Sequence, residues 1–489
     1  MSTQLGAQDA QFLYLQTAEV LTHVMSINLY DGRKAGGRRL RLSDVVRQVS
    51  SRCHLSPVYG RRLYRLPGDF DFPYWIEDAQ FAPADHVSAV RLPRPGGWPE
   101  FCELVGRRFA QPMDLERPLW DILVVEGLDA LPGVAPGSVA LLQRFHHAAI
   151  DGASGAYALA ALSDADEQGT PVLAAPAPGH GAATTPTPAT VVYRALASGV
   201  ASPVKMLDAV LRISPALVRA ARRQVSDDTP PDRAGVPVTR FNQRVAKQRS
   251  FAATEIRLDA LQGIRRAVPG ATVNDVILAI CSGALRAYLD GHGELPAQPL
   301  VAIAPINARR ARGGDASAGN NVSAMTVPLA THVAGPLERL RAIQCATNDA
   351  KAARSGIGAR LLADVGRHLP GAPLAGFARL IGNERFARSQ ANLVITNVPS
   401  SRQPLYMRGA RLTHQFGMGP VTHGLGLFIS ANGYHEHIAI CLTADSRLMP
   451  DLEVLRACIA QSFGELEAAA GKAVGRSARS RRPAARVRH

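Results

Sequence analysis

The segment 143–152, Gln-Arg-Phe-His-His-Ala-Ala-Ile-Asp-Gly, constrains the fold of this chain more than any other. It contains the pattern His-His-x-x-x-Asp-Gly at positions 146–152. The apolar run 138–145 before the histidines predicts a buried strand, and the small and apolar residues 152–162 predict a helix. The histidines are therefore expected where a strand ends, and Asp151 at the helix N-cap, where its carboxylate can accept backbone N–H bonds or hold an arginine.

This pattern favours acid–base chemistry over a metal site. Adjacent strand residues point to opposite faces, and a zinc protease needs its histidines at i and i+4 of a helix. No second cluster of His, Cys and carboxylate residues has ligand spacing, so no metal is expected. Two core histidines before a capping turn would explain Asp151 and Gly152, but not two adjacent imidazoles. A histidine base beside a cavity can remove the proton of an alcohol, which indicates acyl transfer.

The sequence lacks the motifs of covalent catalysis and of nucleotide binding. It has no Gly-x-Ser-x-Gly elbow, and its six cysteines include no Cys-x-x-Cys pair. Neither a Gly-x-Gly-x-x-Gly motif nor a Walker A loop is present. Direct transfer in a ternary complex is therefore expected, without a bound cofactor.

The histidine motif resembles that of the CoA-dependent acyltransferase superfamily, which includes chloramphenicol acetyltransferases, peptide-synthetase condensation domains and carnitine acyltransferases. Other segments are similar to the bacterial wax ester synthase/diacylglycerol acyltransferase family, in that family's order. They are 5–14 (Leu-Gly-Ala-Gln-Asp-Ala-Gln-Phe-Leu-Tyr), 118–120 (Pro-Leu-Trp), 273–276 (Val-Asn-Asp-Val), 319–320 (Gly-Asn), 396–399 (Thr-Asn-Val-Pro) and 442–445 (Leu-Thr-Ala-Asp). The resemblance implies acyl-CoA as the donor co-substrate.

The expected fold class is α/β, because helical periodicity and alternating strands are mixed along the chain. The resemblance implies two chloramphenicol-acetyltransferase-like α/β sandwich lobes joined by a linker, with an active-site tunnel between them. A chain of 489 residues with 46% apolar content can form two such cores. The expected parts are a first lobe (1–163), a flexible linker rich in Ala, Pro, Gly and Thr (164–189), a basic amphipathic helical connector (190–226), a second lobe (227–470) and a basic disordered tail (471–489).

The resemblance also suggests roles for the motif residues. It places the general base at the second histidine, His147, which would take the acceptor's hydroxyl proton and later protonate the CoA thiolate. His146 is expected to hold its neighbour by packing and hydrogen bonding. Asp151, followed by Gly152, resembles the superfamily's structural aspartate, which pairs with an arginine. Arg309 is the candidate partner.

Asn274 is the best candidate outside the histidine motif. It lies at the start of a helix predicted at 274–289, followed by Asp275, which is expected to be structural. Its amide could donate to the oxyanion or hold His147. A plain N-cap explains the same residue equally well, and only the resemblance favours the functional role.

The remaining candidates lie in the other motifs. The expected substrate-binding residues are Gln16, Trp120, Ser323, Thr396 and Asn397, and Pro118 is expected to be structural. Gln16 stands where the family commonly has a glutamate, and an amide cannot supply that charge because it does not titrate. Ser400-Ser401 also replaces the Gly-Pro that usually follows Asn-Val-Pro in the family.

The net charge of +15 is concentrated at the end of the chain, where residues 471–489 contain seven basic residues and no acid. In 190–223, basic residues alternate with apolar ones, which predicts either a membrane-surface helix or an ordinary packing helix. Nucleic acid is not an expected partner, because the tail lacks aromatic residues for stacking. No run approaches 18 apolar residues, no signal peptide opens the chain, and the cysteines are unpaired, so a cytoplasmic location is expected.

The sequence thus predicts an O-acyltransferase that moves a long-chain acyl group from acyl-CoA to diacylglycerol or a long-chain alcohol. A peripheral position on the inner membrane face or on lipid droplets is expected. Two alternatives stay open: an acyltransferase of the same superfamily that acts on a polyketide-derived or other secondary-metabolite alcohol, and a non-catalytic lipid-surface-binding protein with this fold. Acceptor preference depends on tunnel shape, on which the motifs carry no information.

Overall fold

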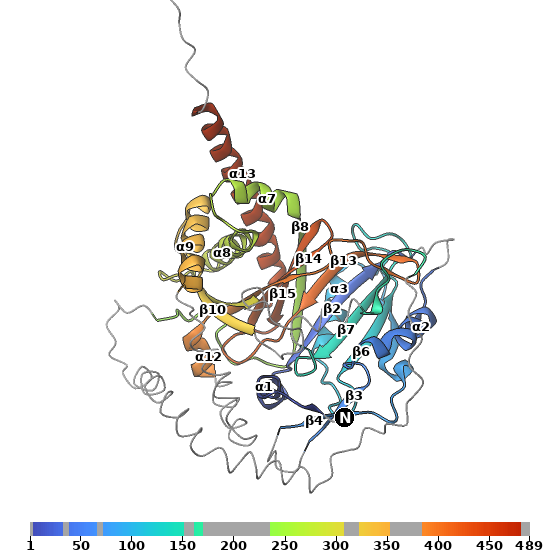
Figure 1. The fold of residues 1–489 in the computed structure, drawn as a ribbon. Helices are drawn as coiled ribbons and strands as arrows, with labels where there is room; N and C mark the ends of the chain where they lie inside the picture. The colour runs from blue at the N-terminus through green and yellow to red at the C-terminus, as the bar shows by residue number, and fades with distance from the viewer. Residues whose placement is uncertain are drawn as a thin grey trace, which may run out of the picture.

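The computed structural model describes residues 3–32, 39–65, 72–150, 161–169, 235–307, 322–352 and 384–480. Within these ranges the chain forms two lobes, each built on a six-stranded sheet (Figure 1). Helices pack on both sheets, which confirms the predicted mixed α/β fold with two lobes.

The sheet of the first lobe has the strand order β12-β13-β2-β7-β6-β5. Its strands are β2 (His23–Tyr30), β5 (Val87–Arg91), β6 (Trp120–Glu126), β7 (Val139–His146), β12 (Tyr406–Met407) and β13 (Ala410–Met418). The surrounding helices are α2 (Leu42–Arg52) and α3 (Trp98–Phe109), with the short 3-10 helices η1 (Cys53–Leu55) and η3 (Pro83–His86). A small sheet, β1 (Thr3–Gln4), β4 (Tyr74–Glu77) and β3 (Arg61–Tyr64), lies with α1 (Ala7–Leu15) at one end of this lobe (Figure 1).

The apolar run before the two histidines is strand β7, and all of its residues are buried. Alternate residues of the strand point to opposite faces of the sheet. Leu141 belongs to a core that also contains Val45 and Val49 of α2. Leu142 points the other way, into a core that includes Phe251 of the second lobe. The strand is apolar throughout because both of its faces are covered.

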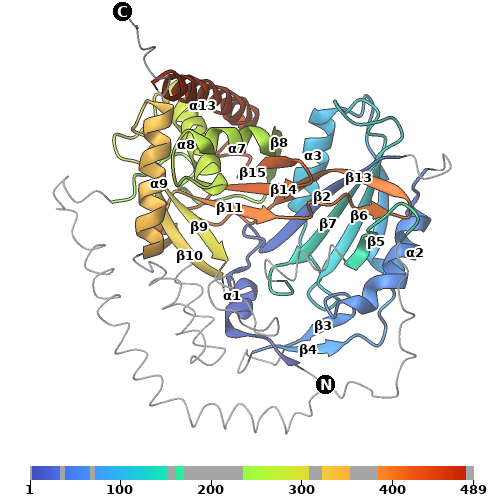
Figure 2. The ribbon, with the colours of Figure 1, turned by 45° about the horizontal axis from the view of Figure 1, so that its top comes forward.

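The sheet of the second lobe has the order β10-β9-β11-β14-β15-β8. Its strands are β8 (Arg249–Arg257), β9 (Val301–Asn307), β10 (Val322–Pro328), β11 (Leu393–Pro399), β14 (Leu427–Tyr434) and β15 (His437–Asp445). Figure 2 shows α7 (Leu258–Arg266), α8 (Val273–Gly291), α9 (Pro336–Ala352) and α13 (Leu452–Ser480) gathered on one face of this sheet. The short helix α12 (Glu384–Gln390) precedes β11. None of the described helices is both long and apolar enough to cross a lipid bilayer.

The C-terminal part of the chain contributes two strands to the sheet of the first lobe, so the lobes do not divide the chain at a single point. β12 and β13 come from the C-terminal part of the chain but extend the first sheet, where Met418 of β13 lies opposite Met25 of β2. The boundary between a first lobe at 1–163 and a second at 227–470 stays a prediction. Residues 170–234, which contain most of the predicted linker and the whole basic connector, lie outside the described residues.

The structure corrects the sequence-based description of two short segments. Asp164, predicted to begin the flexible linker, is buried, and its carboxylate accepts hydrogen bonds from Gln48 Nε2 and the backbone N–H of Arg408. Residues 471–480, predicted to be disordered, continue helix α13 to Ser480. The prediction of disorder rested on the excess of basic residues, but helix α13 includes the first of these basic residues.

Candidate active site

The two histidines lie at the end of β7, where backbone hydrogen bonds hold them from both neighbouring strands. The N–H of His146 donates to the carbonyl oxygen of Leu119 at 3.0 Å, beside β6. The N–H of His147 donates to the carbonyl oxygen of Thr22 at 2.9 Å, beside β2. Consecutive side chains on a strand diverge, so the two rings occupy different surroundings.

The ring of His146 is buried and hydrogen-bonded at both nitrogens. Its Nδ1 accepts the backbone N–H of Ala148 at 3.1 Å, so the proton of the neutral ring lies on Nε2. Nε2 lies 2.9 Å from Gln16 Oε1 and 3.2 Å from Thr22 Oγ1. Burial, together with a smaller effect of the nearby His23 and His147, lowers the pKa of His146 to about 3. His146 is therefore neutral and fixed in one tautomer at neutral pH.

His147 lies in a different environment. It keeps part of its surface exposed, whereas His146 has none. Its ring stacks on Phe12 of α1, with the centroids 3.8 Å apart and the planes inclined by 13°. The hydroxyl of Thr22 lies 2.7 Å from the carbonyl oxygen of Phe12, which ties this stacking partner to the group that holds His146. Of the two rings, His147 is the one that can meet a substrate.

The structure brings two of the predicted polar residues together on the second lobe. Asn274, in the first turn of α8, accepts a hydrogen bond at 3.3 Å from Asn397 Nδ2 of β11. This contact uses the carbonyl oxygen of the Asn274 amide, so its NH₂ group points elsewhere. Thr396 precedes Asn397 on β11, whose residues pair with β14.

The N-cap of α8 is Thr272, so the plain N-cap explanation for Asn274 is wrong. Thr272 Oγ1 accepts the N–H of Asp275 at 3.2 Å, and the Asp275 carboxylate accepts the N–H of Thr272 at 2.8 Å. These reciprocal bonds form a capping box. The Asp275 carboxylate also accepts the hydroxyl of Thr347 at 2.7 Å.

Trp120 is a core residue, which corrects the expectation that it binds substrate. Its side chain is 1% exposed, and its Nε1 donates to the carbonyl oxygen of Tyr59 at 2.8 Å. The ring stacks on His86, with the centroids 4.6 Å apart. As the first residue of β6 it points to the face that packs beneath α2. Pro118 precedes the strand, and its carbonyl oxygen accepts the N–H of Trp120 at 2.8 Å.

Several predicted residues cannot be placed in the site. Asp151, Gly152 and Arg309 lie outside the described residues. The backbone of Ser323 pairs with Ile306 in the β10–β9 ladder. No group of three or more potential metal-binding side chains occurs in the part of the chain that the structure describes.

Two residues of the site have no signal of their own in the sequence. Phe12 lies inside the N-terminal motif, but nothing there predicts that its ring stacks on His147. Thr22 directly precedes a strand and could be any polar residue at a strand end. Gln16 was predicted to bind substrate, and the structure places it against His146 instead.

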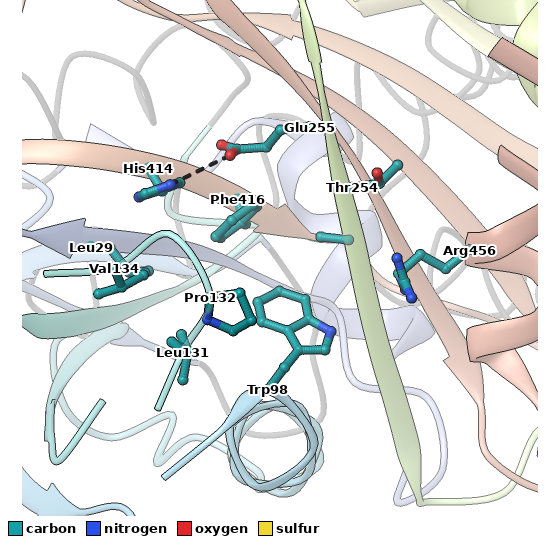
Figure 3. Close-up of a pocket in the computed structure, with 11 residues that line it drawn as sticks. Leu29, Trp98, Leu131, Pro132, Val134, Thr254, Glu255, His414, Phe416 and Arg456 are labelled. Atoms are coloured by element: carbon teal, nitrogen blue, oxygen red, sulfur yellow. Dashed lines mark ion pairs between the residues drawn. The ribbon is translucent and has the colours of Figure 1, made fainter. Parts of the chain in front are cut away.

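A cavity of about 290 Å³ between the lobes (Figure 3) lies away from His146 and His147. Leu29, in its wall, is six residues along β2 from His23, which lies opposite His146; the two places are therefore roughly 20 Å apart along the strand. Its polar side holds Glu255 of β8 and His414 of β13, 3.5 Å apart. Burial raises the pKa of Glu255 to about 7. The cavity contains none of the predicted site residues.

Comparison with known proteins agrees with this architecture. The family model of the wax ester synthase/diacylglycerol acyltransferase catalytic domain matches residues 5–277, and that of the WS/DGAT C-terminal domain matches residues 318–467. The chain therefore belongs to the wax ester synthase/diacylglycerol acyltransferase family. It is an acyl-CoA-dependent O-acyltransferase of that type.

Three similar proteins illustrate the relationship. The Mycobacterium tuberculosis (strain H37Rv) protein named "Putative diacyglycerol O-acyltransferase Rv3087" is 32% identical over 96% of this chain and 97% of its own. The structure of a wax ester synthase/diacylglycerol acyltransferase from Marinobacter aquaeolei VT8 is 25% identical, with a TM-score of 0.68 over 96% of this chain and 100% of its own. TRI3 trichothecene 15-O-acetyltransferase from Fusarium sporotrichioides is 12% identical, with a TM-score of 0.58 over 96% of this chain and 95% of its own, and shows the shared fold.

Proposed function

We propose that this protein transfers a long-chain acyl group from acyl-CoA to a hydroxyl acceptor, diacylglycerol or a long-chain alcohol, with His147 as the general base. The difference between the two histidine rings carries the proposal. His146 is buried, with hydrogen bonds at both ring nitrogens, whereas His147 is partly exposed and held by stacking on Phe12. A base must be rigidly placed and still reach its substrate, and His147 meets both conditions.

The proposed reaction has one acyl transfer and no covalent enzyme intermediate. His147 takes the hydroxyl proton of the acceptor as its oxygen attacks the thioester carbonyl carbon. The resulting oxyanion would be stabilised by a hydrogen bond from the Asn274 amide, whose NH₂ group is directed away from Asn397. When the tetrahedral intermediate collapses, the C–S bond breaks and the CoA thiolate takes the proton from His147.

Two parts of the proposal concern segments outside the described residues. Asp151 would pair with Arg309 and support the turn after the histidines, without taking part in proton transfer. The basic segment 190–226 would bring the enzyme to an anionic membrane or lipid-droplet surface, where each basic residue contributes about 1 kcal/mol. Lipid acceptors are concentrated at such surfaces.

The test is acceptor-dependent thiol release from palmitoyl-CoA, with diacylglycerol and hexadecanol offered separately. His147→Ala should lower kcat by about 10²–10⁴-fold, the usual contribution of a positioned base, with little loss of stability. His292→Ala is a matched control, because this histidine is also partly exposed but hydrogen-bonds to Tyr288 and Asp451 at the end of α8. Near-normal turnover by His147→Ala would refute the mechanism.

A further inference from the structure

The loop formed by residues 17–21 connects α1 to β2, and the residues at its two ends hold His146. Gln16 precedes the loop and Thr22 follows it, and both lie within hydrogen-bond distance of His146 Nε2. The loop is closed by its own bonds: Thr17 N donates to the carbonyl oxygen of Val20 at 2.9 Å, and Val20 N donates to Thr17 Oγ1 at 3.1 Å. A displacement of this loop would therefore move both partners of His146.

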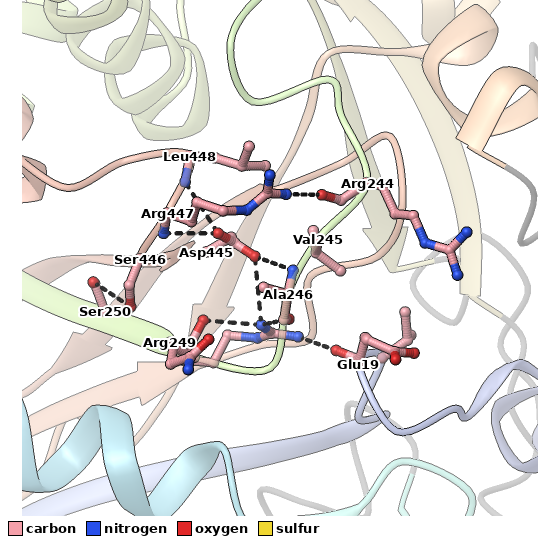
Figure 4. A network of polar contacts seen from close by, with 12 residues as sticks. Glu19, Arg244, Val245, Ala246, Arg249, Ser250, Asp445, Ser446, Arg447 and Leu448 are labelled. Atoms are coloured by element: carbon pink, nitrogen blue, oxygen red, sulfur yellow. Dashed lines mark hydrogen bonds and ion pairs between the residues drawn. The ribbon is translucent and has the colours of Figure 1, made fainter.

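The 17–21 loop belongs to the first lobe by sequence, but it is anchored in the second. Val20 is buried in the core of the second lobe, in a cluster that includes Phe241 and Val245. The guanidinium of Arg249, the first residue of β8, donates from Nη2 to the carbonyl oxygen of Glu19 (Figure 4). One apolar and one polar contact thus join the loop to the opposite lobe.

Arg249 is itself held firmly by buried groups. Its side chain is 2% exposed, and Nη1 donates to the carbonyl oxygens of Ala246 at 2.5 Å and Gln248 at 3.0 Å. The carboxylate of Asp445 lies 3.9 Å away and is fully buried. Burial lowers the pKa of Arg249 to about 10, against the opposite effect of Asp445, so the guanidinium remains charged at neutral pH.

Asp445 is fixed in turn by the backbone around it. It accepts the N–H groups of Arg447 at 2.8 Å and Leu448 at 3.0 Å, and also that of Ala246 (Figure 4). Helix α3 of the first lobe packs directly against the backbone of Arg249: a Cβ atom on Gly106 would lie 2.3 Å from the carbonyl oxygen of Arg249. Contacts with both lobes therefore hold Arg249 in position.

We propose that Arg249 is a positioning residue for the catalytic His147: from the second lobe it fixes the 17–21 loop, whose ends hold His146 beside His147. This inference rests on the proposed function, in which His147 must be accurately placed. Burying a charged pair is costly, and an apolar pair of similar volume is often as stable. The placement of the loop gives this buried charge a role beyond stability.

The test compares Arg249→Met with Arg339→Met. Arg339 is a matched control because it is also buried and donates to two carbonyl oxygens, those of Val333 and Ala334, but both belong to its own lobe. Arg249→Met should lower kcat tenfold or more and change the KM for palmitoyl-CoA less than twofold. Arg339→Met should change kcat less than twofold, whatever its effect on melting temperature. Arg249→Lys should recover part of the rate, because it keeps a charged donor.

A second measurement does not depend on turnover. Diethyl pyrocarbonate modifies neutral imidazoles, and peptide mass spectrometry gives the rate at His146 and His147 separately. Loosening the loop in Arg249→Met should raise this rate at His146 at least threefold, and Arg339→Met should not. If the wild-type protein shows no acceptor-dependent thiol release, the proposed function is refuted. The modification rates of Arg249→Met and Arg339→Met can still be compared, because they do not depend on turnover. Equal modification rates in both variants and wild type, or unchanged kcat in Arg249→Met, would overturn the role of Arg249.

Discussion

At the scale of single residues, the adjacent histidines differ because their neighbours differ. His146 is surrounded by polar partners inside the protein, and desolvation keeps its ring neutral. His147 has an aromatic partner and a partly exposed surface. A positively charged ring at His146 would disfavour protonation of its neighbour, so a neutral His146 helps a base that must accept a proton.

Gln16 should determine how well His146 is held. Gln16→Ala removes the nearer acceptor of the His146 Nε2–H group and leaves only Thr22 Oγ1, at 3.2 Å; a hydrogen bond of this kind contributes about 0.5–1.5 kcal/mol. We expect kcat for palmitoyl-CoA with the preferred acceptor to fall about tenfold, which corresponds to about 1.4 kcal/mol. Gln11→Ala, on the same helix, is the control and should keep the wild-type rate.

Gln16→Glu tests the charge at the same place. A carboxylate beside Nε2 favours the charged imidazolium, so the pKa of His146 should rise from its value of about 3. In histidine-labelled protein, the ¹⁵N resonances of His146 should then titrate at a higher pH than in the wild type. If the ¹⁵N resonances of His146 titrate at the same pH in Gln16→Glu as in the wild type, the residue at position 16 does not determine the pKa of this ring.

At the scale of secondary-structure elements, the start of α8 contains a residue that stabilises the helix, Thr272, and a candidate catalytic residue, Asn274. Thr272 caps the helix through its side chain, whereas Asn274, two residues later, contacts Asn397 on the neighbouring strand. The motif Val-Asn-Asp-Val therefore contains two kinds of residue, because Asp275 completes the capping box.

Substitutions at these positions should have opposite effects on stability and rate. Thr272→Ala removes the N-cap acceptor and should lower the free energy of unfolding by about 1 kcal/mol, measured by urea denaturation, with kcat little changed. Asn274→Ala should leave stability within about 0.5 kcal/mol, as usual for a partly exposed residue, and lower kcat by roughly 10²-fold. An Asn274→Ala enzyme with full activity would remove this residue from the proposed mechanism.

At the scale of the whole molecule, the lobes are joined by two strands that the C-terminal part of the chain adds to the first sheet, by a shared core and by the Arg249 contact. β13 completes the first sheet, and the core between the lobes combines residues of β2, β7, β8 and β15. The 290 Å³ cavity opens at this junction, with Glu255 from one lobe facing His414 from the other. The stability of this junction should therefore depend on whether Glu255 and His414 are charged.

Stability should fall as pH rises through the range in which Glu255 ionises. Burial raises its pKa in the folded protein to about 7, from an ordinary value of 4.5, so the folded state binds this proton more tightly than the unfolded chain does. The protonated Glu255 carboxyl stabilises the folded state fully below about pH 4.5, and this stabilisation is lost as the pH rises through about 7. Glu255→Gln should therefore raise the melting temperature at pH 8 more than at pH 5. Glu103→Gln, at an exposed position on α3, should show no such pH dependence.

The sequence by itself determined the family motifs, the α/β class, strand β7 and the helix after Thr272. These depend on local spacing and on the periodicity of apolar residues, which a chain carries along its length. The two lobes were expected only from the resemblance of those motifs to the family. The same local reasoning misplaced Trp120, because an aromatic residue at a strand end can point either into the core or towards a channel.

Only the tertiary structure decided which distant residues meet. Phe12 and Thr22 reach the histidines across more than a hundred residues of sequence, and Arg249 reaches Glu19 from the other lobe. The addition of β13 to the first sheet likewise depends on pairing between the two ends of the chain. Such contacts follow from how sheets and loops pack in space, and no spacing within a single segment encodes them.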